Sequence, residues 1–219
     1  MEIELYQRVL AANDIVADEN REILNRRRLL TVNIIGSPGA GKTSLICQTL
    51  AGLRVPCAVI EGDIASDFDA KKIAALGVPV IQINTGGSCH LNAVSVAAAL
   101  DKLALEDGIL LVENVGNLIC PASFDLGEDF KVVVASVAEG GDKPYKYPAV
   151  FQQAKAVVIN KIDLLAQVDF DRDFFQAGVR ALNPQAVIFP LSCKTGVGIG
   201  GWSTWLQEQW QTKFRKLFS

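Results

Sequence analysis

One segment constrains this chain more than any other: residues 36–43 read GSPGAGKT and fit the P-loop pattern GxxxxGK[ST]. An apolar run at 29–35 precedes it, as a buried strand would, and residues 44–50 follow it with the composition of a helix. The alternative is an ordinary glycine-rich turn between a strand and a helix. Because strand, loop and helix stand in the order that phosphate binding requires, we predict a P-loop.

The chemistry of such a loop assigns roles to its residues. Backbone N–H groups curl around phosphate oxygens, and the N-terminus of the following helix adds the positive end of its dipole. Lys42 is expected to reach the β- and γ-phosphates, and the Thr43 hydroxyl to hold Mg²⁺. The residues predicted to contact the phosphates are Gly36, Ser37, Pro38, Gly39, Ala40, Gly41, Lys42, Thr43 and Ser44.

Length and composition favour a single compact unit. The 219 residues are half apolar, enough for one domain with a large core. We predict one P-loop domain over 1–219, made of an N-terminal helix at 1–28 and a nucleotide-binding core at 29–219. Along that core, apolar runs alternate with helical patterns, which favours an α/β fold with a mainly parallel sheet flanked by helices on both faces.

The expected boundaries follow from these patterns. Strands are predicted at 30–35, 56–60, 78–83, 109–113, 131–137, 156–160 and 186–191, and helices at 42–53, 66–75, 90–105, 170–182 and 201–217. A further amphipathic helix is predicted at 3–28. It either packs on the surface of its own domain or serves as a helix for dimer or partner contact.

Charge and cysteine content narrow the location and the partners. No apolar run reaches the roughly 18 residues that span a bilayer, and the N-terminus lacks the pattern of a signal peptide. We expect a cytoplasmic protein that binds neither membrane nor nucleic acid, since the net charge is −3. The five cysteines should then be reduced, and clustered ones indicate metal binding or reactivity.

A second motif follows the sixth predicted strand. Residues 160–163 read NKID and match NKxD, in which the carboxylate of Asp163 can accept from both N1–H and the exocyclic amine of guanine. Adenine offers no such pair of donors. Asn160 and Lys161 are expected to brace the loop. The segment of Ser192, Cys193 and Lys194 resembles the loop that supports the guanine O6 through backbone N–H groups.

Acidic residues follow two other predicted strands. Glu113 is placed like a Walker-B acid, able to hold Mg²⁺ directly or through water, and Gly116 gives the backbone room to move toward a γ-phosphate. In the cluster Glu61-Gly62-Asp63, Asp63 is the preferred magnesium ligand or water-orienting acid. Asp67 and Asp69 lie nearby, and helix capping is an equally good explanation for them.

A third group of residues has the composition of a metal site. Cys89 and the single histidine, His90, are adjacent, and Cys120 lies four residues beyond Gly116. Both cysteines follow the carboxyl ends of predicted strands. Two thiolates and an imidazole suit Zn²⁺ or Ni²⁺ and leave a coordination position for water, a second subunit or a recipient protein. The alternative is that they are small buried residues, as we expect Cys47, Cys57 and Cys193 to be.

The motifs together resemble one family. GSPGAGKT, VIEGD, NTGGSCHL at 84–91, ENVGNLICPASFDLGE and NKID resemble HypB, the GTPases that help insert nickel during [NiFe]-hydrogenase maturation. The resemblance covers nearly the whole chain. It implies the SIMIBI class of P-loop GTPases, a nucleotide-regulated homodimer, and a metal site at Cys89, His90 and Cys120. It also implies a nickel metallochaperone and the hydrogenase large-subunit precursor as partners.

Two features depart from some members of the family. No cysteine precedes Cys47, and there is one histidine, so neither an N-terminal cysteine motif nor a histidine-rich tract is present. We expect a slow GTPase that couples hydrolysis to metal delivery. The alternatives are a non-catalytic metallochaperone that uses nucleotide as an assembly signal, or a related GTPase that serves another nickel enzyme such as urease.

Overall fold

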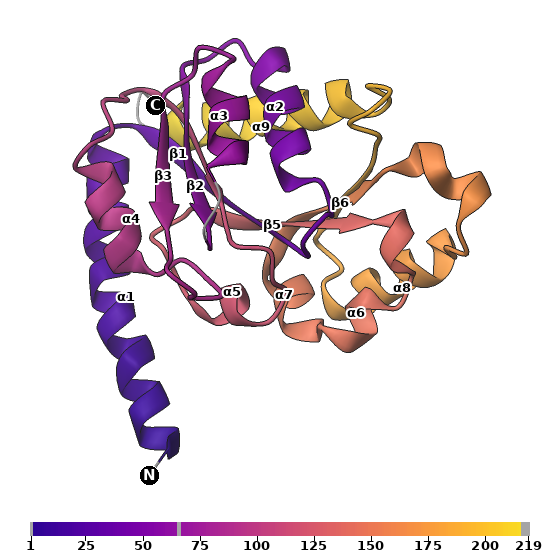
Figure 1. Ribbon diagram of the computed structural model, residues 1–219, viewed down its shortest axis with the longest axis horizontal. Helices are drawn as coiled ribbons and strands as arrows, with labels where there is room; N and C mark the ends of the chain where they lie inside the picture. The colour runs from indigo at the N-terminus through magenta and orange to yellow at the C-terminus, as the bar shows by residue number, and fades with distance from the viewer. Residues whose placement is uncertain (1, 65–66, 216–219) are drawn as a thin grey trace.

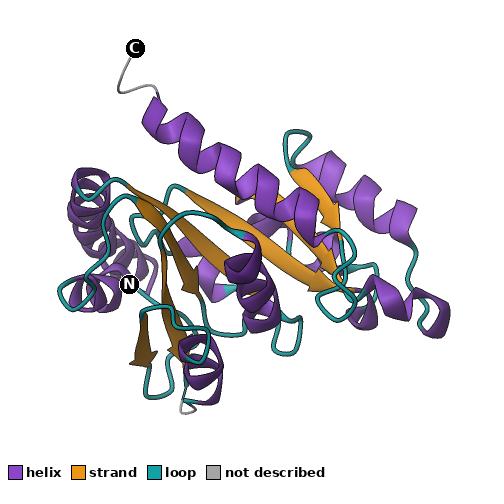
Figure 2. Cartoon of the chain, turned by 90° about the horizontal axis from the view of Figure 1, so that it is seen from above, coloured by secondary structure: helices purple, strands orange, loops and turns teal. Residues whose placement is uncertain are grey.

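A computed structural model describes residues 2–64 and 67–215, and the side chains of 7–64 and 67–214. Its centre is one sheet of seven parallel strands in the order β3-β2-β4-β1-β5-β6-β7 (Figures 1 and 2). The strands are β1 (Leu29–Gly36), β2 (Cys57–Asp63), β3 (Val80–Asn84), β4 (Gly108–Glu113), β5 (Phe130–Ser136), β6 (Ala154–Asn160) and β7 (Val187–Pro190). The predicted fold class and all seven predicted strands are confirmed.

Helices cover both faces of this sheet. They are α1 (Glu2–Arg26), α2 (Lys42–Gly52), α3 (Phe68–Ala74), α4 (Ala93–Leu100), α5 (Cys120–Ser123), α6 (Lys143–Lys146), α7 (Pro148–Gln153), α8 (Arg172–Leu182) and α9 (Ile199–Arg215), with 3₁₀ turns at Val137–Glu139 and Ile162–Gln167. The predicted helices at 66–75 and 201–217 extend at 66 and 216–217 outside the described residues. None of the helices in the described part of the chain is long and apolar enough to cross a membrane.

The strands alternate their side chains between the two faces of the sheet, with one hydrophobic core on one face and two on the other. Leu30, Val32 and Ile34 of β1 point toward α2, α3 and α9, where Trp202 is fully buried. On the opposite face, α1 and α4 cover β2, β4 and β1, and α5, α7 and α8 cover β5 and β6 (Figure 1). Burial on both faces explains why the strands are continuously apolar.

The helix predicted at 90–105 is shorter than expected. Asn92 caps α4, because its side chain accepts from Ser95 N while the Ser95 hydroxyl accepts from Asn92 N. The guanidinium of Arg27 donates to the carbonyls of Leu100 and Leu103, both at 2.9 Å, which satisfies the carbonyls at the other end. Residues 89–91 are thereby left outside the helix, in a loop.

Helix α1 packs on its own domain over its C-terminal half. Ala17, Asn20 and Leu24 are buried against α4 and the loop at 125–126. The N-terminal half extends beyond the body of the protein in Figure 1, and Val9 is exposed there. Packing on the domain surface therefore accounts for the second half of the helix, and a role of the first half in dimer or partner contact stays a prediction.

Candidate functional site

The P-loop lies at the carboxyl end of β1 and leads directly into α2. Gly39 and Gly41 have positive φ values of 76° and 98°, a conformation that glycine adopts without the steric cost of a Cβ. At Gly41 an added Cβ would also lie 2.3 Å from Asn160 Nδ2. The loop borders a cavity of about 460 Å³, and Lys42, Thr43 and Ser44 are among the residues that line it.

Lysine and threonine of the P-loop are held inside this cavity. The Lys42 ammonium donates to the carbonyl of Gly36 at 3.3 Å, and burial lowers the pKa of Lys42. The Thr43 hydroxyl donates to Glu113 Oε1 at 2.9 Å. Thr43, Asp63 and Glu113, the three predicted Mg²⁺ ligands, all line the same cavity, and so does Gly116.

A further acid lies beside Glu113. Glu61 of β2 pairs in register with Glu113 of β4, and the two carboxylates are 2 % and 4 % exposed. Among the described residues, neither Glu61 Oε2 nor Glu113 Oε2 has a hydrogen-bond partner. Burial, followed by the charge of Glu113, raises the pKa of Glu61 to about 8, and burial raises the pKa of Glu113 to about 7. Two buried oxygens without a donor fit a bound cation.

The sequence pattern favoured Asp63 in this cluster, and Glu61 was not predicted to have a role. The available signal was the alternation of side chains along a strand: Glu61 and Asp63 point to the same face of β2. Asp67 is the residue before α3, but its side chain makes no capping hydrogen bond and pairs with Lys71 at 2.5 Å. Asp69 lines the phosphate cavity and pairs with Lys72 at 3.6 Å. The Asp67 side chain therefore does not act as a cap, and the role of Asp69 stays open.

The NKID segment forms a second, connected cavity of about 270 Å³ that Gly41, Asn160, Lys161, Asp163 and Cys193 border. Asn160 joins it to the P-loop, since its Nδ2 donates to the Ala40 carbonyl at 3.0 Å and its Oδ1 accepts from Cys193 N at 3.2 Å.

Further contacts in this cavity join segments that lie far apart in the sequence. The Lys161 ammonium donates to the Gly39 carbonyl at 2.6 Å. The Ser192 hydroxyl donates to Asp163 Oδ1 at 2.5 Å, and Lys194 completes the lining. A carboxylate thus lies in a small, mostly apolar space next to the P-loop, as base recognition requires.

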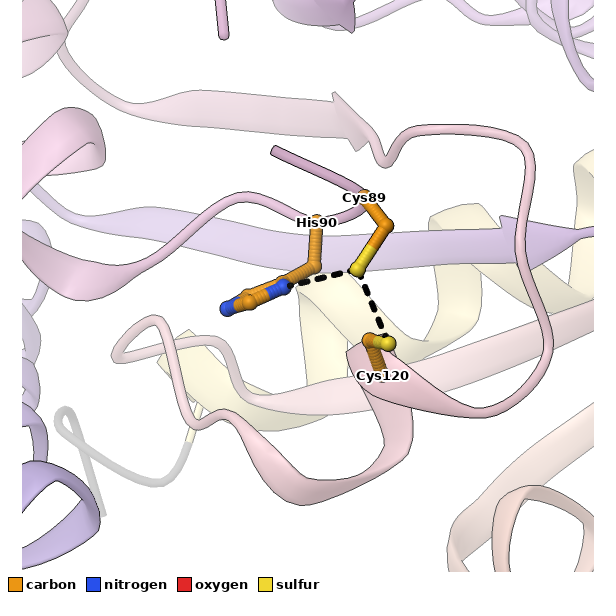
Figure 3. Close-up of side chains that lie close together, drawn as sticks. All are labelled: Cys89, His90 and Cys120. Atoms are coloured by element: carbon orange, nitrogen blue, oxygen red, sulfur yellow. Dashed lines mark hydrogen bonds between the residues drawn. The ribbon is translucent and has the colours of Figure 1, made fainter. Parts of the chain in front are cut away.

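The predicted metal ligands also come together, at the same edge of the sheet (Figure 3). Cys89 Sγ lies 2.9 Å from Cys120 Sγ and 3.6 Å from His90 Nδ1, and one ligand atom from each residue lies within 4.8 Å of the others. Strands β3 and β4 are not neighbours, because β2 runs between them. The loop from β3 therefore crosses the end of β2, where Thr85 N donates to the Asp63 carbonyl at 2.9 Å.

The state of these side chains suits metal binding. All five cysteines are free thiols, and a sulfur–sulfur distance of 2.9 Å is longer than a disulfide bond. Burial lowers the pKa of His90, which favours the neutral imidazole that binds metals. The hydrogen bond with Cys120 raises the pKa of Cys89, so a metal ion that binds there must displace the thiol proton. Burial raises the pKa of Cys57 and of Cys193 to about 11, as expected of structural thiols.

Comparison with known proteins shows the family of this chain. The profile of the "CobW/HypB/UreG, nucleotide-binding domain" matches residues 30–190. "Hydrogenase maturation factor HypB" of Azotobacter vinelandii is 48 % identical over 216 residues, which are 97 % of this chain and 71 % of that protein. The chain belongs to the HypB family. The HypB of Escherichia coli (strain K12) is 49 % identical over 204 residues, 92 % of this chain and 70 % of that protein.

A solved HypB structure extends the likeness to three dimensions. The "Crystal structure of HypB from Helicobacter pylori in complex with nickel" superimposes with a TM-score of 0.88 and 36 % identity, covering 93 % of this chain and 97 % of the other. Membership of the HypB family identifies the P-loop cavity as part of a nucleotide-binding domain. In this HypB-family chain, the thiol cluster and the nucleotide cavity share one edge of one sheet.

Proposed function

We propose that this HypB-family protein is a regulatory GTPase that couples GTP binding and hydrolysis to nickel delivery during [NiFe]-hydrogenase maturation. One observation carries the proposal. The segment that lines the phosphate cavity through Glu113 and Gly116 reaches Cys120 of the thiol cluster only four residues later. A change in that segment on loss of the γ-phosphate would therefore alter the position of a metal ligand.

The nucleotide is held by residues that follow three strands, β1, β6 and β7. The backbone of Gly36, Ser37, Pro38, Gly39, Ala40 and Gly41 cradles the phosphates with Lys42, Thr43 and Ser44, and Asn160, Lys161, Asp163, Ser192, Cys193 and Lys194 hold the guanine. Mg²⁺ fits among Thr43, Asp63 and Glu113, with Glu61 beside them, because this donor set consists of hard oxygens. When bound, Mg²⁺ neutralises charge that develops on the phosphate oxygens.

Hydrolysis by the isolated protein is expected to be slow. None of the described residues that line the phosphate cavity is an arginine or a glutamine, the side chains that commonly stabilise the transition state or orient water in fast GTPases. Lys42, Thr43, Asp63, Glu113 and Gly116 then act by positioning and by charge. A slow reaction suits a switch whose state must last long enough for a partner to respond.

The cargo is proposed to be Ni²⁺, with Zn²⁺ as the competing ion. Cys89, His90 and Cys120 supply three ligands and leave the cluster accessible at the surface, since Cys89 is exposed. The open position is available to a second copy in a nucleotide-dependent homodimer, to a nickel metallochaperone or to the hydrogenase large-subunit precursor. The single-domain organisation over 1–219 and the cytoplasmic location belong to the same proposal.

The test is a titration of Ni²⁺ and Zn²⁺ into nucleotide-free, GDP-bound and GTP-analogue-bound protein, with the oligomeric mass measured in each state. Metal affinity that differs between the two nucleotide states supports coupling, and equal affinities contradict it. Absence of GTP turnover would instead favour the non-catalytic metallochaperone. The names of the relatives from A. vinelandii and E. coli favour hydrogenase over urease as the recipient.

A further inference from the structure

The side chain of Asn117 connects the two segments that carry the thiols. Its Nδ2 donates to the Cys89 carbonyl at 3.3 Å, and its Oδ1 accepts from Ile119 N, next to Cys120, at 2.9 Å. The orientation of the amide is fixed, because one partner is an acceptor and the other is a donor. One half-buried amide thus contacts the backbone of both segments.

The backbone of Asn117 is in turn attached to the P-loop. It forms an isolated antiparallel bridge with Gly36, the first residue of the loop. The preceding residue, Gly116, lies against Pro38: an added Cβ there would be 3.0 Å from Pro38 Cα and Pro38 N. A shift of the loop on binding phosphate is therefore passed to residues 116 and 117 by direct contact.

The next part of the Cys89 segment is held in place by the core. Leu91 N donates to Asn114 Oδ1 at 3.0 Å, and the Asn114 amide donates to Asn33 Oδ1 at 3.2 Å. Asn33 Nδ2 donates to Glu128 Oε1 at 3.1 Å, so the chain of buried side chains ends on a carboxylate. The Leu91 side chain also fills the space above Gly62.

Cys89 and His90 therefore lie between a fixed point and a movable one. Leu91 is held through the buried side chains of Asn114, Asn33 and Glu128. The polar atoms of these side chains are all hydrogen-bonded, which makes Leu91 a rigid position. The carbonyl of Cys89 is held by Asn117, whose backbone follows the phosphate loop. Movement of residues 116–117 would change the distance from Cys89 to Cys120, and a metal–thiolate bond tolerates only about 0.2 Å of change.

We infer that Asn117 is the positioning residue that transmits the state of the nucleotide to the metal cluster. This inference rests on the proposed function and specifies how its two sites communicate. Asn117 is neither one of the three metal ligands nor one of the residues that line the phosphate cavity, although its side chain also forms a hydrogen bond with the Cys89 thiol. Its loss should therefore change the coupling between the sites more than the affinity of either one.

Two substitutions separate the contacts of Asn117. Asn117→Asp keeps an acceptor for Ile119 N and loses the donor to Cys89, whereas Asn117→Ala loses both. Asn183 is a matched control at the far side of the sheet. It is also half-buried, its Oδ1 also accepts from the backbone two residues later, at Gln185, and its Nδ2 also donates to distant carbonyls, at Gln152 and Ala154.

The measured quantity is the ratio of Zn²⁺ dissociation constants, by chelator competition, between the GDP-bound and GTP-analogue-bound full chain. The wild type and the Asn183→Asp and Asn183→Ala variants should show a ratio of about fivefold or more. In Asn117→Asp and Asn117→Ala the ratio should fall toward unity. The negative charge that Asn117→Asp adds near the cluster should change the two Zn²⁺ dissociation constants by the same factor. Their ratio therefore reports only on the coupling between the two sites. By reciprocity, the effect of Zn²⁺ on nucleotide affinity should fall as well.

The possible outcomes distinguish the role of Asn117 from the coupled function on which it rests. A wild-type ratio of unity overturns the coupled function and the role of Asn117 together. A clear wild-type ratio that persists in Asn117→Ala overturns the role of Asn117 and leaves the coupled function standing. Equal losses of coupling in the Asn117 and Asn183 variants would show a general loss of stability, and would also overturn the assignment.

Discussion

The buried pair of Glu61 and Glu113 makes a strong prediction about stability and pH. In the unfolded chain Glu61 ionises near its ordinary pKa, but in the nucleotide-free folded protein burial and Glu113 raise that pKa to about 8. Between these values the folded protein binds more protons than the unfolded chain. Its stability should therefore fall as pH rises through the interval, contrary to the usual effect of a paired carboxylate.

Glu61→Gln removes this dependence and keeps the shape of the side chain. Each proton of difference is worth about 1.4 kcal/mol per pH unit. Between about pH 5.5 and pH 7.5, the ionisation of Glu61 should thus lower the free energy of unfolding of the wild type by about 2 kcal/mol. The variant should be more stable than the wild type at both pH values, and its advantage should grow by about 2 kcal/mol from the lower pH to the higher one.

The assay is urea unfolding of nucleotide-free protein in a chelator, at both pH values, with the free energy of unfolding extrapolated to water. Mg²⁺ with GDP provides the control. A cation held by Glu61 and Glu113 stabilises their charged forms, so its addition should flatten the wild-type dependence on pH and reverse the advantage of Glu61→Gln. Parallel pH profiles for the two proteins without Mg²⁺ would refute the reasoning.

Three further predictions concern the two sites directly. Lys42→Ala and Thr43→Ala should each abolish GTP hydrolysis in a phosphate-release assay while the circular dichroism spectrum is kept; normal turnover by either would contradict the P-loop assignment. The wild type should hydrolyse GTP in preference to ATP, and Asp163→Asn should shift the preference toward xanthosine triphosphate; equal turnover of ATP and GTP by the wild type would remove the guanine assignment. Cys120→Ala should weaken Ni²⁺ binding at least about 10-fold in a chelator competition, by analogy with the loss of supporting groups at metal sites, and leave GDP affinity nearly unchanged. Wild-type Ni²⁺ affinity should also fall on acidification, because protons compete for Cys89 and Cys120; unchanged affinity in Cys120→Ala would mean that the metal binds elsewhere.

Local pattern was enough for much of this protein. The P-loop could be predicted because its glycines, Lys42 and Thr43 lie within one segment of eight residues, at the spacing that phosphate binding requires. Continuous apolar runs predicted the seven parallel strands, since burial on both faces leaves no alternation. Because parallel strands share one carboxyl edge, the order of motifs along the chain also placed the acids, the thiols and NKID at a common edge.

Tertiary structure alone decided which side chains meet. Glu61 becomes the partner of Glu113 through the register between β2 and β4, a non-local pairing that no local pattern reveals. Cys89 reaches Cys120 although β2 separates their strands, because α4 begins only at its cap and leaves residues 89–91 free to cross as a loop. The Asn117 side chain meets the Cys89 carbonyl, 28 residues away in the sequence, while its backbone forms a bridge with Gly36 of the P-loop. Spacing in a sequence fixes which groups are present on an element, whereas register and packing fix the direction and the distance between groups from different elements.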